Sequence, residues 1–243
     1  MIRAHLATFP PRRRILRRVV EAILPQVDHL FVVLNEYDAV PRYLAKEPRV
    51  TAVIPDRDVK DAGKFWFAPD PDDLVFLIDD DIGYPQDYVA STLARVEGLD
   101  LGRHVFGYFA LFLIHDIASG RRYWDVRRFT EQHEVVTGAT CLGTGTLFAR
   151  GDCIAPLEAV EDSAGFVDYG YGHWLNSNGI LPWALPRAEN WLTNDLPKNL
   201  WNTSLFKTVN RKNPPEVRRK LAAFAGQWPH ANQPFDSYRA VTP

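Results

Sequence analysis

Cysteine is scarce in this sequence. Its 243 residues include two cysteines, Cys141 and Cys153, so at most one disulfide bond can form. No paired pattern of cysteines and histidines with the spacing of zinc ligands accompanies them. Small disulfide-rich domains and zinc modules need several such residues. The sequence therefore argues against both a disulfide scaffold and a zinc module.

Long apolar runs and a large excess of charge are also missing. The opening residues, MIRAHLATFPPRRR, lack the continuous apolar core of a signal peptide. The longest apolar stretch, FGYFALFLI (106–114), is too short to cross a bilayer as a helix. We therefore expect a cytoplasmic protein. The net charge of −2 gives no reason to expect nucleic acid as the main partner.

What the sequence does contain is the pattern of an α/β domain. With 46% hydrophobic and 24% charged residues, the chain can bury a sizeable core. The first hundred residues predict, in order, a strand at 2–8, a helix from Arg12 to Pro25, strands at 29–35, 50–55 and 73–79, and a helix at 84–97. Apolar strands that alternate with helices are typical of a parallel sheet.

The second half of the chain has a different pattern. Strand-like segments follow one another without long helices until a predicted helix at 167–179 and a short strand at 180–185. We interpret them as added strands, some of them antiparallel. The strand-like segments cover residues 104–116, 121–129, 134–138 and 144–150. The tail from Pro186 is predicted to be irregular until a helix at 216–226. Because no repeat or low-complexity linker divides the chain, we expect a single domain over residues 1–243.

Three consecutive aspartates, in the stretch FLIDDDIGYP (76–85), follow the last predicted strand of the first half. Adjacent carboxylates repel one another, and the repulsion grows when they are shielded from water. Ligands of open α/β sheets bind beyond the carboxyl ends of the parallel strands, where this triplet lies. Asp79 and Asp81 would present two carboxylates to one hard cation such as Mg²⁺ or Mn²⁺. An acidic turn that caps the following helix is the alternative.

Four stretches together resemble the nucleotide-sugar-dependent glycosyltransferases of the GT-A fold, particularly the family-2-like group. They are AHLATFPPR (4–12), DAGKFWFA (61–68), FLIDDDIGYP (76–85) and VDYGYGHWLNSNGI (167–180). The resemblance implies a single GT-A-like domain, in which residues 1–100 bind the nucleotide sugar and 101–190 bind the acceptor. Residues 191–243 would form a C-terminal extension.

The resemblance also implies roles for individual residues. Thr8 and Pro10 would border the nucleotide base, Lys64 would pair with a phosphate, and Asp56, or else Asp58, would bind the uracil or ribose. The members of the aspartate triplet would divide two tasks. A divalent metal ion, Mn²⁺ or Mg²⁺, would be held by Asp79 and Asp81, and Asp80 would contact the ribose or support the site. Asp195 and His230 are candidates for a third metal ligand.

Asp168 falls on the family's general base. It would take the proton from the acceptor hydroxyl as that hydroxyl attacks, which inverts the anomeric carbon. The alternative is that Asp168 caps the N-terminus of the following helix, which would leave Glu161 or Asp162 as the base. The chain departs from the family pattern at two positions, with Val167 in place of an acidic residue and Trp174 in place of an arginine.

The resulting hypothesis is a metal-dependent, inverting glycosyltransferase that moves a sugar from a UDP-sugar to a glycan or glycoconjugate, as in polysaccharide biosynthesis. Two alternatives stay open: a sugar nucleotidyltransferase, and a catalytically inactive glycan-binding protein on the same fold. GTGTLFAR (143–150) resembles the family segment beside the acceptor, although a tight turn explains its glycines equally well. An N-terminal arginine cluster (Arg12, Arg13, Arg14, Arg17 and Arg18) is either a solvated helix face or a peripheral contact with anionic lipid or glycan.

Overall fold

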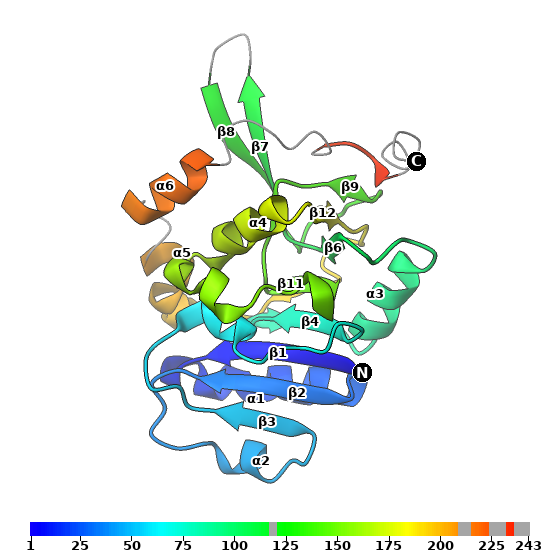
Figure 1. The fold of residues 1–243 in the computed structure, drawn as a ribbon. Coiled ribbons are helices and arrows are strands. Elements are labelled where there is room, and N and C mark those ends of the chain that lie inside the picture. Colours follow the sequence, from blue (N-terminus) through cyan, green and yellow to red (C-terminus); the bar gives the residue numbers. More distant parts are fainter. Residues whose placement is uncertain (117–120, 209–214, 224–231, 236–243) are drawn as a thin grey trace.

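The computed structural model describes residues 1–116, 121–208, 215–223 and 232–235. Its centre is an eight-stranded sheet with the strand order β3-β2-β1-β4-β11-β6-β12-β9 (Figure 1). The strands are β1 (Ile2–Thr8), β2 (His29–Leu34), β3 (Val50–Val53), β4 (Leu74–Ile78), β6 (His104–Gly107), β9 (Thr137–Gly138), β11 (Thr146–Arg150) and β12 (Leu181–Ala184). Strands β1 to β4 run parallel, and β12 runs parallel to β6, whereas β11 and β9 are antiparallel to their neighbours. The expected α/β architecture, a mostly parallel sheet with added antiparallel strands, is confirmed.

Helices cover both faces of this sheet. Successive residues of β4 point to opposite faces: Phe76 and Ile78 belong to one core, and Val75 and Leu77 to the other. The first core is closed by α1 (Arg13–Ile23), α2 (Arg42–Ala45) and α3 (Tyr88–Val96), and the second by the 3-10 helix η3 (Lys60–Phe65) and by α4 (Val167–Ser177). A strand that is buried on both faces has the continuous apolar run seen in DLVFLI.

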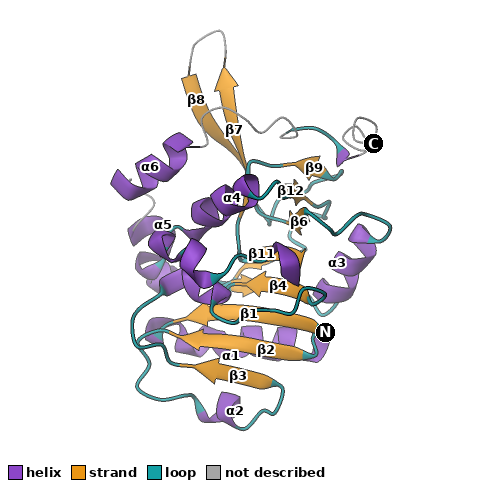
Figure 2. Ribbon diagram, viewed as in Figure 1, coloured by secondary structure: helices purple, strands orange, loops and turns teal. Residues whose placement is uncertain are grey.

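The predicted strand at 104–116 is two strands in two different sheets. β6 ends at Gly107, and β7 (Ala110–Asp116) pairs with β8 (Arg121–Arg127) and β10 (Cys141–Leu142) in a separate three-stranded sheet. Figure 2 shows β7 and β8 projecting as a hairpin from one end of the molecule. The Thr146 hydroxyl accepts hydrogen bonds from the backbone N–H groups of Tyr108 and Phe109 (3.2 and 2.9 Å). These bonds replace the strand ladder at the point where the chain changes sheets.

The tail is more ordered than expected. Its first element, β13 (Thr193–Asn194), pairs with β5 (Ile82–Gly83), directly after the aspartate triplet. The short helix α5 (Leu205–Thr208) follows, and α6 (Pro215–Ala223) lies where a helix was predicted at 216–226, the last three residues of which are outside the described part. Among the residues that the structure describes, no helix has both the length and the apolar character needed to cross a membrane.

Candidate active site

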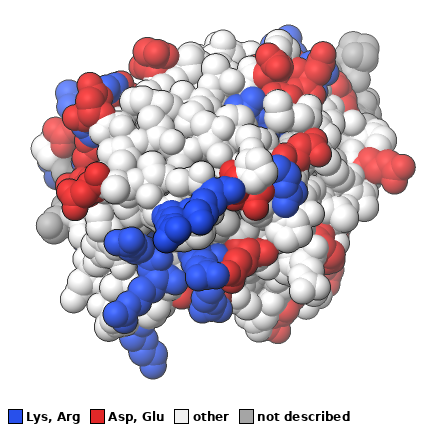
Figure 3. All heavy atoms as spheres, turned by 90° about the horizontal axis from the view of Figure 1, so that it is seen from below, with Lys and Arg blue, Asp and Glu red and all other residues white. Residues whose placement is uncertain are grey.

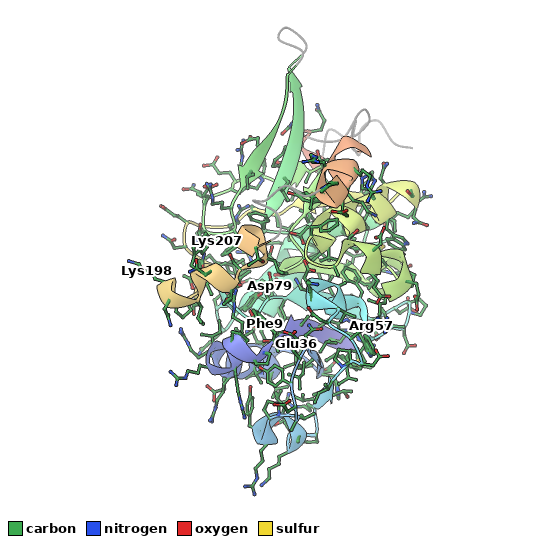
Figure 4. All side chains as sticks on the ribbon, turned by 90° about the vertical axis from the view of Figure 1, so that its left-hand side faces the viewer. Phe9, Glu36, Arg57, Asp79, Lys198 and Lys207 are labelled. Atoms are coloured by element: carbon green, nitrogen blue, oxygen red, sulfur yellow. The ribbon has the colours of Figure 1, made fainter. Side chains whose placement is uncertain are left out.

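The carboxyl ends of the parallel strands meet at one edge of the sheet. Thr8 ends β1, Asn35 follows β2, and Asp79 follows β4. Because β11 runs antiparallel beside β4, the loop at 143–145 that precedes β11 reaches the same edge. Figure 4 views the molecule from this side, with Asp79 near the centre of the view. In open α/β sheets this is the edge at which ligands bind.

Lys64 lies at the centre of a charged cluster at this edge. Its side chain is only 3% exposed, and its Nζ forms an ion pair with Asp79 Oδ1 and donates a hydrogen bond to Thr144 Oγ1 (2.9 Å). Burial lowers the pKa of Lys64, but the negative charges of Asp79, Asp168 and Asp61 outweigh it, so the net shift is upward. Lys64 is therefore a permanent cation that joins these carboxylates.

Asp168 lies in the first turn of α4, beside the loop at 143–145. Its Oδ1 accepts hydrogen bonds from the backbone N–H and the hydroxyl of Thr144, both at 2.8 Å. In the part of the chain that the structure describes, its Oδ2 accepts none. Burial raises the pKa of Asp168, although Lys64 and Thr144 act in the opposite direction. The capping alternative is not what the structure shows, because Phe166 occupies the N-cap position of α4.

Asp61 binds the N-terminus of α4 instead. Its Oδ1 accepts a hydrogen bond from the Gly165 N–H, and its Oδ2 accepts one from the Val167 N–H at 3.2 Å. Carboxylates are favourable at helix N-termini, where backbone N–H groups lack partners. Burial raises the pKa of Asp61 to about 6. Because Asp61 and Lys64 both belong to η3, this contact places α4, and with it Asp168, beside Lys64.

Asn35 in turn fixes η3 to the end of β2. Its Oδ1 accepts a hydrogen bond from the Val59 N–H (2.9 Å), and its Nδ2 donates one to the Lys60 carbonyl (3.0 Å). A second contact, between His5 Nδ1 and the Lys64 carbonyl (2.8 Å), fixes the other end of η3 to β1. The position of the Lys64 ammonium is thus set by two neighbouring strands.

Tyr84 and Gly145 fix the position of Asp79. The Tyr84 hydroxyl accepts a hydrogen bond from the Asp79 N–H (2.8 Å) and donates one to the Gly145 carbonyl (2.5 Å). A Cβ atom at Gly145 would overlap the Asp79 carboxylate. Glycine is therefore needed at 145 so that the backbone can approach Asp79, while Gly143 packs against the Phe109 side chain.

The other two aspartates face a different cation. Arg12 NH1 lies 2.7 Å from Asp81 Oδ2 and 3.5 Å from Asp80 Oδ1. The Thr8 hydroxyl donates a hydrogen bond to Asp80 Oδ2 (2.6 Å). The structure thus divides the triplet: Asp79 turns to Lys64, whereas Asp80 and Asp81 share Arg12. Asp81 nevertheless lies close enough to Asp79 for the charge of Asp79 to raise its pKa, and a cation shared by the two stays a prediction.

Negative charge at the triplet is only partly offset. Burial, followed by the charge of Asp81, raises the pKa of Asp80 to about 7. Burial, followed by the charge of Asp79, also raises the pKa of Asp81. Arg12 opposes both shifts but does not cancel them. The ionised triplet therefore stands to gain from further positive charge.

These carboxylates fit a hard divalent cation that takes most of its ligands from elsewhere. Within the described residues, no group of three or more His, Cys, Asp or Glu side chains is placed to hold a metal ion. Mg²⁺ and similar ions commonly bind one or two carboxylates together with phosphate oxygens and water. Asp79, whose side chain is 37% exposed, and Asp81, at 23%, are the accessible members of the triplet. The donors present thus match a cation that arrives with a phosphate.

The stability of the metal-free protein is expected to depend on Asp80 as the pH rises. A carboxyl whose folded pKa is raised binds more protons in the native state than in the unfolded state, so its contribution falls from about pH 4 to about pH 7. In EDTA, Asp80→Asn should therefore gain stability relative to the wild type between pH 5 and pH 7.5, as measured by chemical denaturation. An equal pH dependence of the two proteins would contradict this assignment.

Of the remaining predicted residues, Pro10 and Asp56 are exposed, whereas Asp195 contacts the backbone of the triplet. Pro10 is exposed at the start of the short 3-10 helix η1 (Pro10–Arg12). The Asp56 side chain is 81% exposed and pairs with Arg57, which Figure 4 shows to one side of Asp79. The Asp195 N–H donates to the Asp81 carbonyl, and its carboxylate pairs with Arg18. His230 lies outside the described residues.

The sequence analysis gave no role at this edge to four of its residues: Arg12, Asp61, Tyr84 and Thr144. Asp61 had a usable signal, because it precedes Lys64 by three residues and lies within the stretch already selected. Thr144 stands between the two glycines of GTGT, which explain that segment by backbone conformation alone. Arg12 had no signal of its own, since it is the first of three consecutive arginines.

Comparisons with known proteins identify no family for the chain. No family model matches its sequence, and no curated protein does. Among solved structures, the chain resembles a mycobacterial protein (15% identity, 93% of this chain and 75% of that one, TM-score 0.49). It also resembles glucosyl-3-phosphoglycerate synthase from Mycobacterium tuberculosis, solved with Mn²⁺, UDP-glucose and phosphoglyceric acid (14% identity, 98% of this chain and 91% of that one, TM-score 0.47). A third neighbour is 4-diphosphocytidyl-2C-methyl-D-erythritol synthase (11% identity, 92% of this chain and 99% of that one, TM-score 0.44). At these values the likenesses concern the fold and carry no assignment of activity.

Proposed function

We propose that the protein is a metal-dependent, inverting glycosyltransferase that moves a sugar from a nucleoside diphosphate, preferably UDP, to a hydroxyl of a glycan or glycoconjugate. The observation that carries the proposal is the cluster around Lys64. The buried Lys64 pairs with Asp79 and is linked through Thr144 to Asp168. Asp79 is a strand-end carboxylate suited to a phosphate-bound metal, and Asp168 is a half-buried carboxylate suited to proton transfer.

The donor would lie along the carboxyl ends of β1 and β4. Thr8 and Pro10 would border the nucleotide, and Asp79 and Asp81 would hold a divalent cation together with the diphosphate. That cation would neutralise the negative charge of the leaving diphosphate. Arg12 and Lys64 keep the aspartates oriented, so the site loses little freedom when the donor binds.

Asp168 would act on the acceptor. Thr144 fixes its Oδ1, which leaves Oδ2 to accept the proton of the acceptor hydroxyl. The acceptor oxygen then bonds to the anomeric carbon while the bond from that carbon to the diphosphate oxygen breaks. The nucleoside diphosphate leaves with the bonding electrons. Attack from the face opposite the leaving group inverts the anomeric centre.

Binding of nucleotide and metal is the most direct test. We expect UDP or GDP to raise the melting temperature in the presence of Mn²⁺ and to do so much less in EDTA, because a ligand specific to the native state stabilises it. Asp79→Asn and Asp81→Asn should each abolish the metal-dependent part of this rise in melting temperature. Asp72→Asn is the matched control, since this carboxylate is exposed and lies on the turn before β4.

Absence of nucleotide binding under every metal condition would overturn the proposal and favour the glycan-binding alternative. Stabilisation by a nucleoside triphosphate, with pyrophosphate released on addition of a sugar phosphate, would instead indicate a nucleotidyltransferase. An equal loss of binding in Asp72→Asn would show that the aspartates act on folding and not on the ligand.

A further inference from the structure

A basic groove lies between α1 and α2, outside the cluster just described. It has a volume of about 770 Å³ and is lined by Arg13, Arg14, Arg17, Pro41, Arg42, Tyr43 and Lys46. Five of these seven side chains are cationic and none is acidic. In a chain of net charge −2, such a concentration of positive charge is local. Figure 3 shows the side of the molecule that carries α2, where Lys and Arg side chains gather.

The two walls of the groove are built alike. α1 presents Arg13 and Arg17 four residues apart, and Arg42 and Lys46 stand at the same spacing on and just after α2. Residues at this spacing lie on one face of a helix. Tyr43, also on α2, lines the groove, and the Arg17 guanidinium of α1 lies 5.7 Å from its ring centre. An aromatic ring of one wall thus contacts a cation of the other.

Most of these cations lack a carboxylate partner. Arg17 pairs with Glu21, but no ion pair within the described part of the chain involves Arg13, Arg14, Arg42 or Lys46. Among the same residues, the buried Tyr43 hydroxyl has no hydrogen-bond partner. All five cations are exposed, so water screens much of their mutual repulsion, and a bound anion would relieve the rest.

The helix itself gains nothing from this arrangement. The first turn of α1 carries arginines and no acidic residue, although the positive end of the helix dipole disfavours cations there. The same dipole would favour an anion seated in the groove. Charge and dipole thus select the same kind of ligand.

We propose that this groove binds a phosphate-bearing anionic ligand, supplied either as a lipid headgroup at a membrane surface or as a soluble phosphate compound. The groove is next to the candidate active site along the chain, because Arg12 turns inward to Asp80 and Asp81 whereas Arg13 turns outward. It is a separate site, since its lining includes none of the residues placed in the donor or acceptor sites. The proposal does not depend on the proposed function.

The test compares two triple variants of the full-length protein. The groove variant is Arg14→Gln, Arg42→Gln and Lys46→Gln. The control variant is Arg128→Gln, Arg150→Gln and Arg219→Gln, which removes the same charge from arginines that each pair with a carboxylate elsewhere. Vesicles of phosphatidylcholine, with and without phosphatidylglycerol, probe the lipid source by co-sedimentation. Inorganic pyrophosphate probes the soluble source by calorimetry in EDTA.

We expect the wild type and the control variant to bind one of these probes and the groove variant to bind it far more weakly. Each Lys or Arg near an anionic surface strengthens binding by about fivefold, so removal of three should weaken binding on the order of a hundredfold. Binding should weaken as salt is added. Vesicle binding identifies a headgroup ligand, and pyrophosphate binding without vesicle binding identifies a soluble one.

The proposal is overturned if the wild type binds neither probe, or if both variants lose binding equally. Stabilisation by nucleotide and Mn²⁺ should be unchanged in the groove variant. If nucleotide and Mn²⁺ do not stabilise the wild type, the proposed transferase is refuted, but the result for the groove is unaffected. The two proposals can therefore fail separately.

Discussion

Replacing Lys64 with methionine is expected to lower the free energy of unfolding by about 3 kcal/mol. Removing one partner of a buried ion pair typically costs about 3–5 kcal/mol, because the other charge stays buried without compensation. The lower end applies because Asp79 keeps 37% of its side-chain exposure and can be rehydrated. Urea denaturation at neutral pH, in EDTA, measures the loss directly.

Lys60→Met is the matched control for this change. Lys60 lies in the same 3-10 helix but forms an exposed pair with Asp58, and such pairs contribute at most about 1 kcal/mol. The loss in Lys64→Met should also shrink as the pH falls below about 6, where Asp61, with its raised pKa, takes up a proton and no longer needs a countercharge. Similar losses in the two variants would show that Lys64 does not hold the cluster together.

Replacing Asp168 with asparagine is expected to lower the rate of sugar transfer by about 10²–10⁴-fold, the usual contribution of a positioned general base. Asparagine can still accept the hydrogen bonds from Thr144 through its amide oxygen, so the local structure should survive. Its amide group, however, cannot accept the acceptor proton. The measurement is release of nucleoside diphosphate from a panel of nucleotide sugars with hydroxyl acceptors.

Asp162→Asn provides the comparison for Asp168→Asn. Asp162 is exposed and pairs with Lys220, so its loss should leave the rate close to that of the wild type. Nucleotide binding in the presence of Mn²⁺ should be retained in Asp168→Asn, because the residues proposed to hold the donor, Asp79 and Asp81, do not include Asp168. If Asp168→Asn keeps full activity, the base lies elsewhere. A slow Asp162→Asn variant would then make Asp162 the candidate.

Local patterns were sufficient to predict most of the fold. The first strands and α1 were predicted from apolar runs, from apolar periodicity and from the breaker Pro25, and α4 lies within the helix predicted at 167–179. The division of residues 104–116 into β6 and β7 was not predictable in this way. An apolar run has no internal mark where it passes from one sheet to another, and the division depends on Thr146, a residue about forty positions away that binds the backbone there.

The candidate site was predictable to the extent that strand ends could be recognised. Asp79 was selected because it ends a predicted strand, and Lys64 because its stretch, residues 61–68, resembles a nucleotide-contacting segment; the structure does bring the two together. Arg12 differs from Arg13 and Arg14 only in its place on the 3-10 turn before α1, which directs it inward to the aspartates. The direction in which each arginine side chain points follows from tertiary packing, so it cannot be read from a run of identical residues.

The cluster around Lys64 also has a consequence for how the protein folds. Its hydrogen bonds join η3 to Thr144, 80 residues later, and to the start of α4, about a hundred residues later. Closing such long loops costs entropy before any contact repays it. We therefore expect the cluster to form late, after the intervening strands have paired, with its charges solvated until then. A chain cut between residues 64 and 144 would lose this order of assembly, even if both fragments kept their secondary structure.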